Sequence, residues 1–366
     1  MKKVALFGGS FDPFHTDHLN IIKACHDDLK FDEVWIILTY LNPFKISSSS
    51  SVIERLEMIE LGIKNLDYAK IKLFEIKKQS KTYTYDTIAH YKLKYSEIHF
   101  SFIMGSDQLD NFEKWYKFSK LIKKIEFFVF LREEHYNKNI VNKYQLKTFI
   151  FKNNYLSSTK IRNLIDLPLQ LEQIKDYINE NLMYLHERLQ TKMEEKRYIH
   201  SLHVGIEALK LAKLNNYKNP NQALIAGVLH DIAKQWTNSE LEQIICEFDK
   251  NLLKEPKPVW HSFAGAFHLK RDWLLNDDEI INAVFKHSVA DIKMSVLDMI
   301  VFCADKISSE RNYECLSKLR KETYKDLKTG FKLILKHQYD FAVKKNSKYK
   351  IGNMIIKSYN HWIGES

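Results

Sequence analysis

Cysteine, proline and glycine are scarce in this sequence of 366 residues, which contains four, six and ten of them. The cysteines are widely scattered and form no Cys-x-x-Cys pair, so we expect reduced thiols in a cytoplasmic protein. No apolar run approaches the ~18 to 20 residues that a membrane-spanning helix requires, and we expect no membrane partner. The first apolar run, 4–7, is too short for a signal peptide and ends at Gly8-Gly9, which indicates a strand that enters a loop.

A basic stripe is also missing, although the formal net charge is +10. Lysines are spread along the whole chain and often alternate with acids, a pattern typical of solvated helix faces. Because no recognisable motif interleaves basic residues with aromatics, we expect no nucleic-acid partner. Positive charge of this kind suits small polyanions such as nucleotides. Whether the chain forms a homo-oligomer stays open.

The chain is long enough for two domains, and its 45% apolar and 28% charged residues are typical of globular proteins. Up to about residue 165, short β-branched or aromatic runs alternate with helical stretches, which predicts an α/β domain with a doubly wound parallel sheet. From about residue 169 the apolar residues recur at helical spacing, which predicts an all-α domain. We place the two domains at 1–184 and 185–366, joined by a short turn or a continuous helix.

These patterns predict individual elements as well. The expected strands are 4–7, 33–38, 71–75, 98–104 and 126–131. The expected helices include 51–65, 85–94, 199–213, 220–234, 279–287 and 295–306.

A candidate phosphate site follows the first predicted strand. Gly8-Gly9-Ser10 would place bare backbone amides at the carboxyl edge of the sheet, where ligands bind in this class of fold. His15 and His18 are three residues apart at the start of the next predicted helix, so both side chains can point the same way. Two imidazoles there could donate hydrogen bonds to phosphate oxygens and offset charge in a transition state.

The segment Gly9-Ser10-Phe11-Asp12-Pro13-Phe14-His15-x-x-His18 resembles the signature of the nucleotidylyltransferase superfamily. More of the chain is similar to the bacterial nicotinate-nucleotide adenylyltransferases, over about residues 1–184. The further matching segments are Asn42-Pro43-Phe44-Lys45, Glu54-Arg55-Leu56-Glu57-Met58, Thr82-Tyr83-Thr84-Tyr85-Asp86-Thr87, Met104-Gly105-Ser106-Asp107, Trp115-Tyr116 and Leu156-Ser157-Ser158-Thr159-Lys160-Ile161-Arg162.

This resemblance implies adenylyl transfer from ATP, accompanied by Mg²⁺, to nicotinate mononucleotide. No protein nucleophile is required, so positioning and charge stabilisation would supply the catalysis. His15 and His18 would be catalytic. The implied ATP-binding residues are Gly8, Gly9, Ser10, Phe11, His15, His18, Asp107, Ser158, Thr159 and Arg162. The implied nicotinate-mononucleotide-binding residues are Lys45, Tyr83, Thr84 and Trp115.

One position departs from the family pattern. Asp17 stands where the family has glycine, and a carboxylate beside a triphosphate would repel it. We expect Asp17 to point away from the phosphates. The competing family for this half of the chain is phosphopantetheine adenylyltransferase, which usually has threonine where His15 stands; His15 and the Thr-Tyr-Thr-x-Asp-Thr segment favour the nicotinate enzyme.

A second group of polar residues interrupts the helical half. His230-Asp231 ends the apolar run 223–229, and histidine with aspartate is the usual ligand set for first-row metal ions. With His200, His261, His287 and Asp305, this order of residues resembles the HD phosphohydrolase superfamily. The family implies one metal on the His, His-Asp and Asp set, and a second metal bridged by Asp231. Iron or manganese would fit, and Asp231 would be catalytic.

Within that superfamily, Arg197-Tyr198-x-His200-Ser201 and the segments around Asp231 and Asp305 are most similar to symmetrical diadenosine tetraphosphate hydrolases. The implied reaction splits a dinucleoside polyphosphate, diadenosine tetraphosphate, into two ADP. Lys234 and Arg311 would contact its phosphates, whereas His203 is expected at the surface. The alternatives are another nucleotide substrate, namely an alarmone, a deoxynucleotide or a cyclic nucleotide, or a regulatory nucleotide-binding module.

Overall fold

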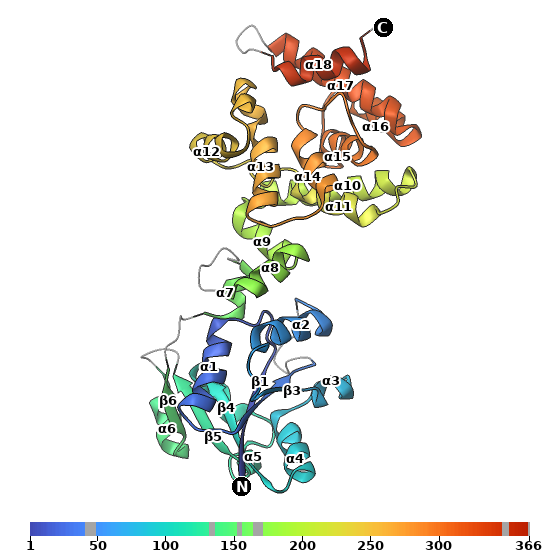
Figure 1. Ribbon diagram of the computed structural model, residues 1–366. Coiled ribbons are helices and arrows are strands. Elements are labelled where there is room, and N and C mark those ends of the chain that lie inside the picture. The colour runs from blue at the N-terminus through green and yellow to red at the C-terminus, as the bar shows by residue number, and fades with distance from the viewer. Residues whose placement is uncertain (41–48, 132–135, 152–155, 164–170, 346–350, 365–366) are drawn as a thin grey trace. The chain divides into compact units, whose positions relative to one another are not determined.

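The computed structural model describes residues 1–40, 49–131, 136–151, 156–163, 171–345 and 351–364. Its chain divides into two compact units, Met1–Tyr184 and Leu185–Ser366. The first unit is an α/β domain and the second is helical (Figure 1), which confirms the predicted fold classes. None of the helices in these ranges is long and apolar enough to cross a membrane.

The first unit is built on a six-stranded sheet in which every neighbouring pair of strands is parallel. The strand order is β3-β2-β1-β4-β5-β6, so the order reverses direction between β1 and β4. In such sheets the crevice beside this reversal, at the carboxyl ends of the strands, is where ligands bind. The strands are β1 (Lys2–Gly9), β2 (Glu33–Leu38), β3 (Ala69–Lys72), β4 (Ile98–Gly105), β5 (Glu126–Leu131) and β6 (Lys147–Ile150).

Two of the strands differ from the prediction. The predicted strand 71–75 is wrong at its carboxyl end, because β3 ends at Lys72 and Phe74–Lys78 forms the helix α3. The short run 71–75 contains both the end of a strand and the start of a helix. The periodicity of apolar residues cannot distinguish the two over so few positions. The sequence does not predict β6, a four-residue strand that pairs only with β5 among the described strands.

Both faces of the sheet are buried, as the alternation along β1 shows. Val4 and Leu6 belong to one apolar cluster, together with residues of α4 (Thr84–Lys94). Ala5 and Phe7 belong to the other, together with residues of α1 (Thr16–Asp27) and α2 (Val52–Ile63). Helices on both faces keep water from the strand backbones, so β1 is buried over residues 4–7, and Gly8 and Gly9 at its carboxyl end are only partly buried. The remaining helices of this unit are η1 (Ser106–Lys114), α5 (Phe118–Leu121), α6 (Lys138–Tyr144), α7 (Ser158–Asn163) and α8 (Glu172–Glu180).

The second unit consists of helices, several of which begin at a side-chain cap. Asn219 accepts a hydrogen bond from the backbone N–H of Gln222, with Pro220 in the first turn, and Asp277 and Ser295 cap two further helices in the same way. The helices are α9 (Leu185–Lys192), α10 (Glu195–Leu214), α11 (Pro220–Leu229), α12 (Asn238–Phe248), η2 (Lys250–Lys254), η3 (Lys257–Val259), α13 (Trp260–Arg271), α14 (Asp278–Lys286), α15 (Val296–Ile307), α16 (Leu316–Lys325), α17 (Leu327–Lys345) and α18 (Asn353–Trp362).

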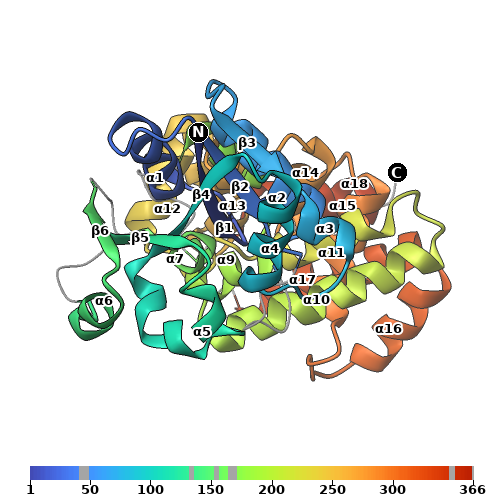
Figure 2. The same cartoon turned by 90° about the horizontal axis from the view of Figure 1, so that it is seen from below.

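The long helix α10 (Figure 2) and its neighbour α11 approach each other closely through glycines. A Cβ atom on Gly227 would lie 2.9 Å from the Cα of Gly205, so neither helix could come as near with a larger residue there. The predicted helix 220–234 is too long, because α11 ends at Leu229 and residues 230–235 form turns. His230 and Asp231 therefore lie at a helix end, on a pair of helices that pack backbone to backbone.

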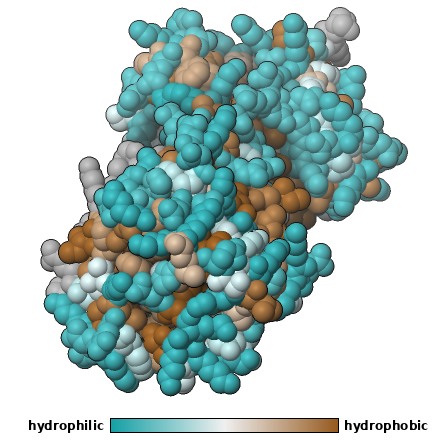
Figure 3. Space-filling view, turned by 60° about the horizontal axis from the view of Figure 1, so that its bottom comes forward, coloured by the Kyte–Doolittle hydropathy of each residue, from teal (hydrophilic) through white to brown (hydrophobic). Residues whose placement is uncertain are grey.

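The surface agrees with the composition. Most of the face shown in Figure 3 is hydrophilic, interrupted by smaller hydrophobic areas. Lys234 is one of the lysines that are only partly exposed, and it lies beside the histidines described below.

Candidate functional sites

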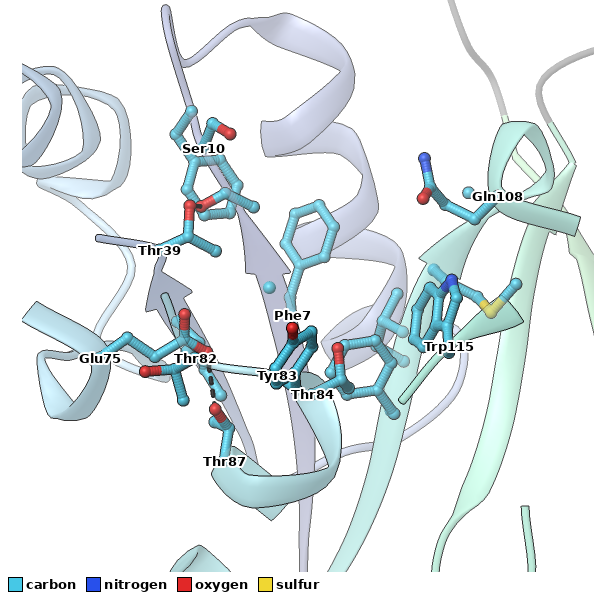
Figure 4. A pocket seen from close by; sticks show the side chains of 18 of the residues that line it. Phe7, Ser10, Thr39, Glu75, Thr82, Tyr83, Thr84, Thr87, Gln108 and Trp115 are labelled. Carbon is cyan, nitrogen blue, oxygen red and sulfur yellow. Dashed lines mark hydrogen bonds between the residues drawn. The ribbon is translucent and has the colours of Figure 1, made fainter. Parts of the chain in front are cut away.

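A cavity of about 530 Å³ lies at the carboxyl edge of the sheet in the first unit. It opens where β1, β2 and β4 end, next to the reversal in strand order (Figure 4). The predicted site residues that line it are Gly8, Gly9, Ser10, Phe11, His18, Tyr83, Thr84, Asp107, Trp115 and Ser158. His15, Thr159 and Arg162 are described but do not line it, and the predicted segment Asn42 to Lys45 lies outside the described residues.

The loop after β1 is shaped by the packing of Phe11. Its backbone has a φ of 50°, a left-handed conformation that is uncommon for a residue with a side chain, and its ring is fully buried. A Cβ atom on Gly9 would lie 2.9 Å from that ring, so glycine is required here to let Phe11 fold back under the loop. Gly8 has ordinary space around it, with Phe102 at 3.5 Å. Gly8, Gly9, Ser10 and Phe11 of this loop line the cavity, and the two glycines place no side chain between their backbone and the cavity.

The two histidines of the motif lie at the start of α1, with their rings stacked and the ring centroids 3.6 Å apart. The backbone N–H of His15 donates to Nδ1 of His18 over 3.2 Å. Because that nitrogen accepts a hydrogen bond, a neutral His18 carries its proton on Nε2 and can donate it to a ligand. His18 is 8% exposed and lines the cavity, whereas His15 is fully buried, does not line it and stacks on His18.

The segment that contains α7 packs against the same loop. Ser158 Oγ donates to the backbone oxygen of Pro13 over 3.1 Å, and Arg162 Nη1 donates to the backbone oxygen of Asp12 over 2.6 Å. Asp17 is buried, and its Oδ2 accepts the backbone N–H of Leu156 over 2.9 Å. The carboxylate therefore faces this segment rather than the cavity, in line with the expectation from the sequence.

Aromatic side chains form the opposite wall of the cavity. Tyr83 stacks on Tyr116, with ring centroids 4.6 Å apart. Trp115 meets Phe112 edge to face at 5.3 Å, and its Nε1 has no hydrogen-bond partner among the described residues. A flat indole with an unused N–H is suited to a heteroaromatic ligand that carries an acceptor.

Glu75 is a cavity residue that the sequence analysis did not identify. It lies on α3, accepts a hydrogen bond from Thr87 Oγ1 over 2.6 Å, and is 5% exposed. Burial raises the pKa of Glu75 to about 7, a shift that the hydrogen bond from Thr87 and the charge of Lys78 only partly offset. No sequence signal separates this glutamate from the exposed ones, because its burial results from the packing of α3 against β2 and α4.

In the second unit, all six predicted metal ligands come together. His200 is on α10, His230 and Asp231 follow α11, and each of the others is on or directly after a further helix. Three overlapping groups have ligand atoms that all lie within 4.8 Å of one another. These groups are His200-His230-Asp231, His230-His287-Asp305 and Asp231-His261-His287.

Each of three histidines is oriented by a hydrogen bond on its Nδ1 atom. His230 Nδ1 lies 2.6 Å from the backbone oxygen of Gly227, and His287 Nδ1 lies 2.6 Å from that of Val284. His200 Nδ1 lies 2.6 Å from Glu310 Oε1. An acceptor on Nδ1 fixes the proton there and leaves Nε2 as a free lone pair, the arrangement seen in metal-binding histidines.

Asp231 presents its two oxygens to two different pairs of histidines. Its Oδ1 lies 3.2 Å from His261 Nε2 and 3.5 Å from His287 Nε2. Its Oδ2 lies 3.4 Å from His230 Nε2 and 3.9 Å from His200 Nε2. The Nε2 atom of His230 is fully buried without a hydrogen-bond partner among the described residues, which a bound metal ion would resolve. The residues present therefore fit a metal centre.

The charges of these side chains suit cation binding at neutral pH. Although burial opposes ionisation, His230 and the neighbouring histidines keep the pKa of Asp231 well below its usual value. Lys306 and His200 do the same for Asp305. Burial lowers the pKa of His287 to about 4, so that its ring is neutral and able to act as a ligand.

Cationic side chains surround the carboxylates. Burial lowers the pKa of Lys234, whose Nζ lies 3.2 Å from His261 Nε2. Arg311 Nη2 donates to Asp305 Oδ1 over 2.6 Å. Arg197, which the sequence analysis used only as part of a motif, donates to Asp231 Oδ2 over 2.7 Å. His203 is half-exposed and bonds Ser309, outside the ligand groups.

Comparisons with known proteins match both units. A cytidylyltransferase-like family model matches residues 6–164, and an HD domain model matches residues 197–310. The probable nicotinate-nucleotide adenylyltransferase/Ap4A hydrolase of Mycoplasma genitalium is 32% identical over 343 residues, covering 92% of this chain and 97% of that protein. Its counterpart in Mycoplasma pneumoniae is 31% identical, over 91% and 98% of the two chains. A probable nicotinate-nucleotide adenylyltransferase of Campylobacter fetus is 39% identical over 163 residues, 44% of this chain and 87% of that one.

Proposed function

We propose two separate activities for this chain, which belongs to the family of proteins that fuse a nicotinate-nucleotide adenylyltransferase to an Ap4A hydrolase. The 1–184 domain would transfer the adenylyl group of ATP to nicotinate mononucleotide. The 185–366 domain would be a metal-dependent phosphohydrolase of the HD type whose substrate is diadenosine tetraphosphate.

The first proposal is supported by a cavity whose lining has two parts, one with hydrogen-bond donors for phosphate and one with aromatic side chains. Backbone amides of the loop 8–11 and the Nε2–H of His18 provide donors for a triphosphate. Tyr83, Thr84 and Trp115 provide an aromatic and polar wall for a pyridine nucleotide. Nicotinate adenine dinucleotide would form when an oxygen of the mononucleotide phosphate attacks the α-phosphorus of ATP and pyrophosphate leaves.

In this reaction the residues of the cavity would position the two substrates and stabilise the transition state, and none of them would form a covalent bond to a substrate. His18 would donate to the phosphate oxygens as negative charge develops on them, supported by the stacked ring of His15. Ser158 would contact the triphosphate from the side of α7, with Thr159 and Arg162 behind it. Mg²⁺ would accompany the ATP, and Asp107, an exposed carboxylate in the cavity wall, would serve its ribose or its ion.

The second proposal is supported by the two-sided environment of Asp231. One metal ion would be held by His200, His230, Asp305 and one oxygen of Asp231, and a second by the other oxygen with His261 and His287. Iron or manganese suits this mixed ligand set. Metal ions bound there supply charge that polarises a phosphate and activates water. Lys234, Arg311 and Arg197 would neutralise the phosphates of the substrate.

The retained ligand set favours hydrolysis over a regulatory module that only binds a nucleotide. The decisive experiment is chromatography of the products after incubating the metal-loaded chain with diadenosine tetraphosphate, with Asp231→Asn as the matched control. ADP as the sole product is expected. ATP with AMP would contradict symmetrical cleavage, and no turnover by a metal-loaded chain would favour an alarmone, a deoxynucleotide, a cyclic nucleotide or mere binding.

The adenylyltransferase is tested by mixing the chain with ATP and one acceptor at a time. Nicotinate mononucleotide should give nicotinate adenine dinucleotide and pyrophosphate. Faster transfer to phosphopantetheine would replace the proposal by the competing family.

A further inference from the structure

We propose that Asp17 is a positioning residue for ATP, which holds the segment 156–163 against the loop 10–15 that joins β1 to α1. This inference rests on the adenylyl transfer proposed above. It starts from the hydrogen bond between Asp17 Oδ2 and the backbone N–H of Leu156, which joins residues 139 positions apart in the sequence. Both residues are buried, with exposed fractions of 1% and 5%.

The contact lies at one end of a short series that fastens the two segments. Leu156 is followed by Ser158, whose hydroxyl donates to Pro13 and which lines the cavity. One helical turn later, Arg162 donates to the backbone oxygen of Asp12. Asp17 accepts its hydrogen bond through a carboxylate, whereas Asp12 and Pro13 accept theirs through backbone oxygens. The bond to Asp17 is therefore charge-assisted and stronger than a neutral one. Ser158 can face the cavity only while its segment stays on the loop.

The carboxylate of Asp17 is directed away from the cavity in which the triphosphate would bind. Asp17 does not line the cavity, and its oxygen is directed at a backbone donor. Glycine, which the resembling family has at this position, offers no side chain to accept that bond. The carboxylate of Asp17 therefore provides a contact between the segment and the start of α1, and the backbone N–H of Leu156 compensates its buried charge.

The test compares Asp17→Ala, Asp17→Gly and Asp17→Asn, because asparagine keeps a side-chain oxygen that can accept the N–H of Leu156. Asp28→Ala, which removes an exposed acid at the other end of α1, is the matched control. We expect the alanine and glycine variants to raise the KM for ATP about tenfold, the loss that one buried hydrogen bond to a charged group corresponds to. The KM for nicotinate mononucleotide should stay unchanged, and asparagine should restore most of the ATP affinity.

A second kind of variant removes the donor of the same hydrogen bond, the backbone N–H of Leu156. Leu156→Pro removes the backbone N–H while keeping an apolar side chain, and it should raise the KM for ATP to a similar extent. Thermal unfolding of each variant separates this effect from a general loss of structure. An unchanged or lower KM for ATP in Asp17→Gly would overturn the proposal, as would equal changes in both KM values.

Calorimetry that measures the affinity for a non-hydrolysable ATP analogue distinguishes failure of the proposed adenylyl transfer from failure of the proposed role of Asp17. If the wild-type chain binds the analogue but does not adenylylate nicotinate mononucleotide, the proposed acceptor is wrong, and the Asp17 variants still decide the present inference. A wild-type chain that binds no ATP analogue would overturn both.

Discussion

The two sites of this chain are constructed in opposite ways. The cavity of the first unit lies at the edge of a sheet, and Gly8, Gly9, Ser10 and Phe11 of one short loop form part of its lining. The centre of the second unit lies inside a helical core and consists of side chains that separate helices deliver. Backbone donors depend on the local conformation of the chain, whereas a ligand cluster depends on every contributing helix. We therefore expect the two sites to fail independently and for different reasons.

The largest expected effect is a double dissociation between the two activities. His18→Ala should lower adenylyl transfer by about 100- to 1,000-fold, because it removes a donor that stabilises the transition state. The same variant should leave hydrolysis unchanged. Asp231→Asn should do the reverse, since it removes the charge that both groups of histidines face. Both activities are measured on each full-length variant.

Metal content by elemental analysis provides a second readout. Asp231→Asn should lose bound metal, and His18→Ala should keep it. Simultaneous loss of both activities in either variant, with intact folding, would contradict the independence of the two sites.

A smaller effect is expected from Glu310, which the structure alone identifies. Although burial opposes its ionisation, the hydrogen bond to His200 keeps the pKa of Glu310 below its usual value. An ionised partner on Nδ1 orients the ring and makes Nε2 a better ligand. Glu310→Gln should weaken metal binding about 10- to 100-fold, the usual range for such partners.

Metal affinity is measured by competition with a chromophoric chelator, independently of hydrolysis. Glu314→Gln, an exposed glutamate on the same loop, is the control. Equal affinities of the Glu310 and Glu314 variants would show that His200 needs no such support.

The smallest effect on activity is expected from substitution of Glu75. Its main consequence is for the pH dependence of the stability of the first unit. Its pKa is about 7 in the folded chain and 4.5 without burial, so the folded state binds the extra proton between these values. The resulting stabilisation is present below about pH 4.5 and is lost as the pH rises through 7. The first unit should become less stable by about 2 kcal/mol between pH 5 and 7, since one pKa unit corresponds to ~1.4 kcal/mol.

Hydrogen exchange of the sheet amides in the full chain measures this free energy for the first unit alone. Glu75→Gln should remove the slope with pH, and the exposed Glu60→Gln should keep it. A Glu75→Gln variant with the slope of the wild type would assign the pH dependence to another group.

Much of the fold was predictable because it follows from local patterns of apolar and polar residues along the sequence. The apolar runs of β1, β2, β4 and β5 and the helical spacing after residue 169 correctly predicted a parallel α/β unit and a helical unit. The errors occur where local patterns are weakest. The run 71–75 joined a strand to a helix, β6 has few residues, and α11 ends earlier than its apolar spacing indicates.

The sequence by itself determined which residues are available to each site. The glycines and histidines of 8–18 and the six candidate metal ligands can be named from motif order, because their proposed chemistry requires particular side chains. Only the tertiary structure decided what those residues contact. Glu310 on His200, Leu156 on Asp17 and the burial of Glu75 join elements that are distant along the chain or depend on how helices pack. Such contacts arise from shape complementarity between whole elements, which no local sequence pattern encodes.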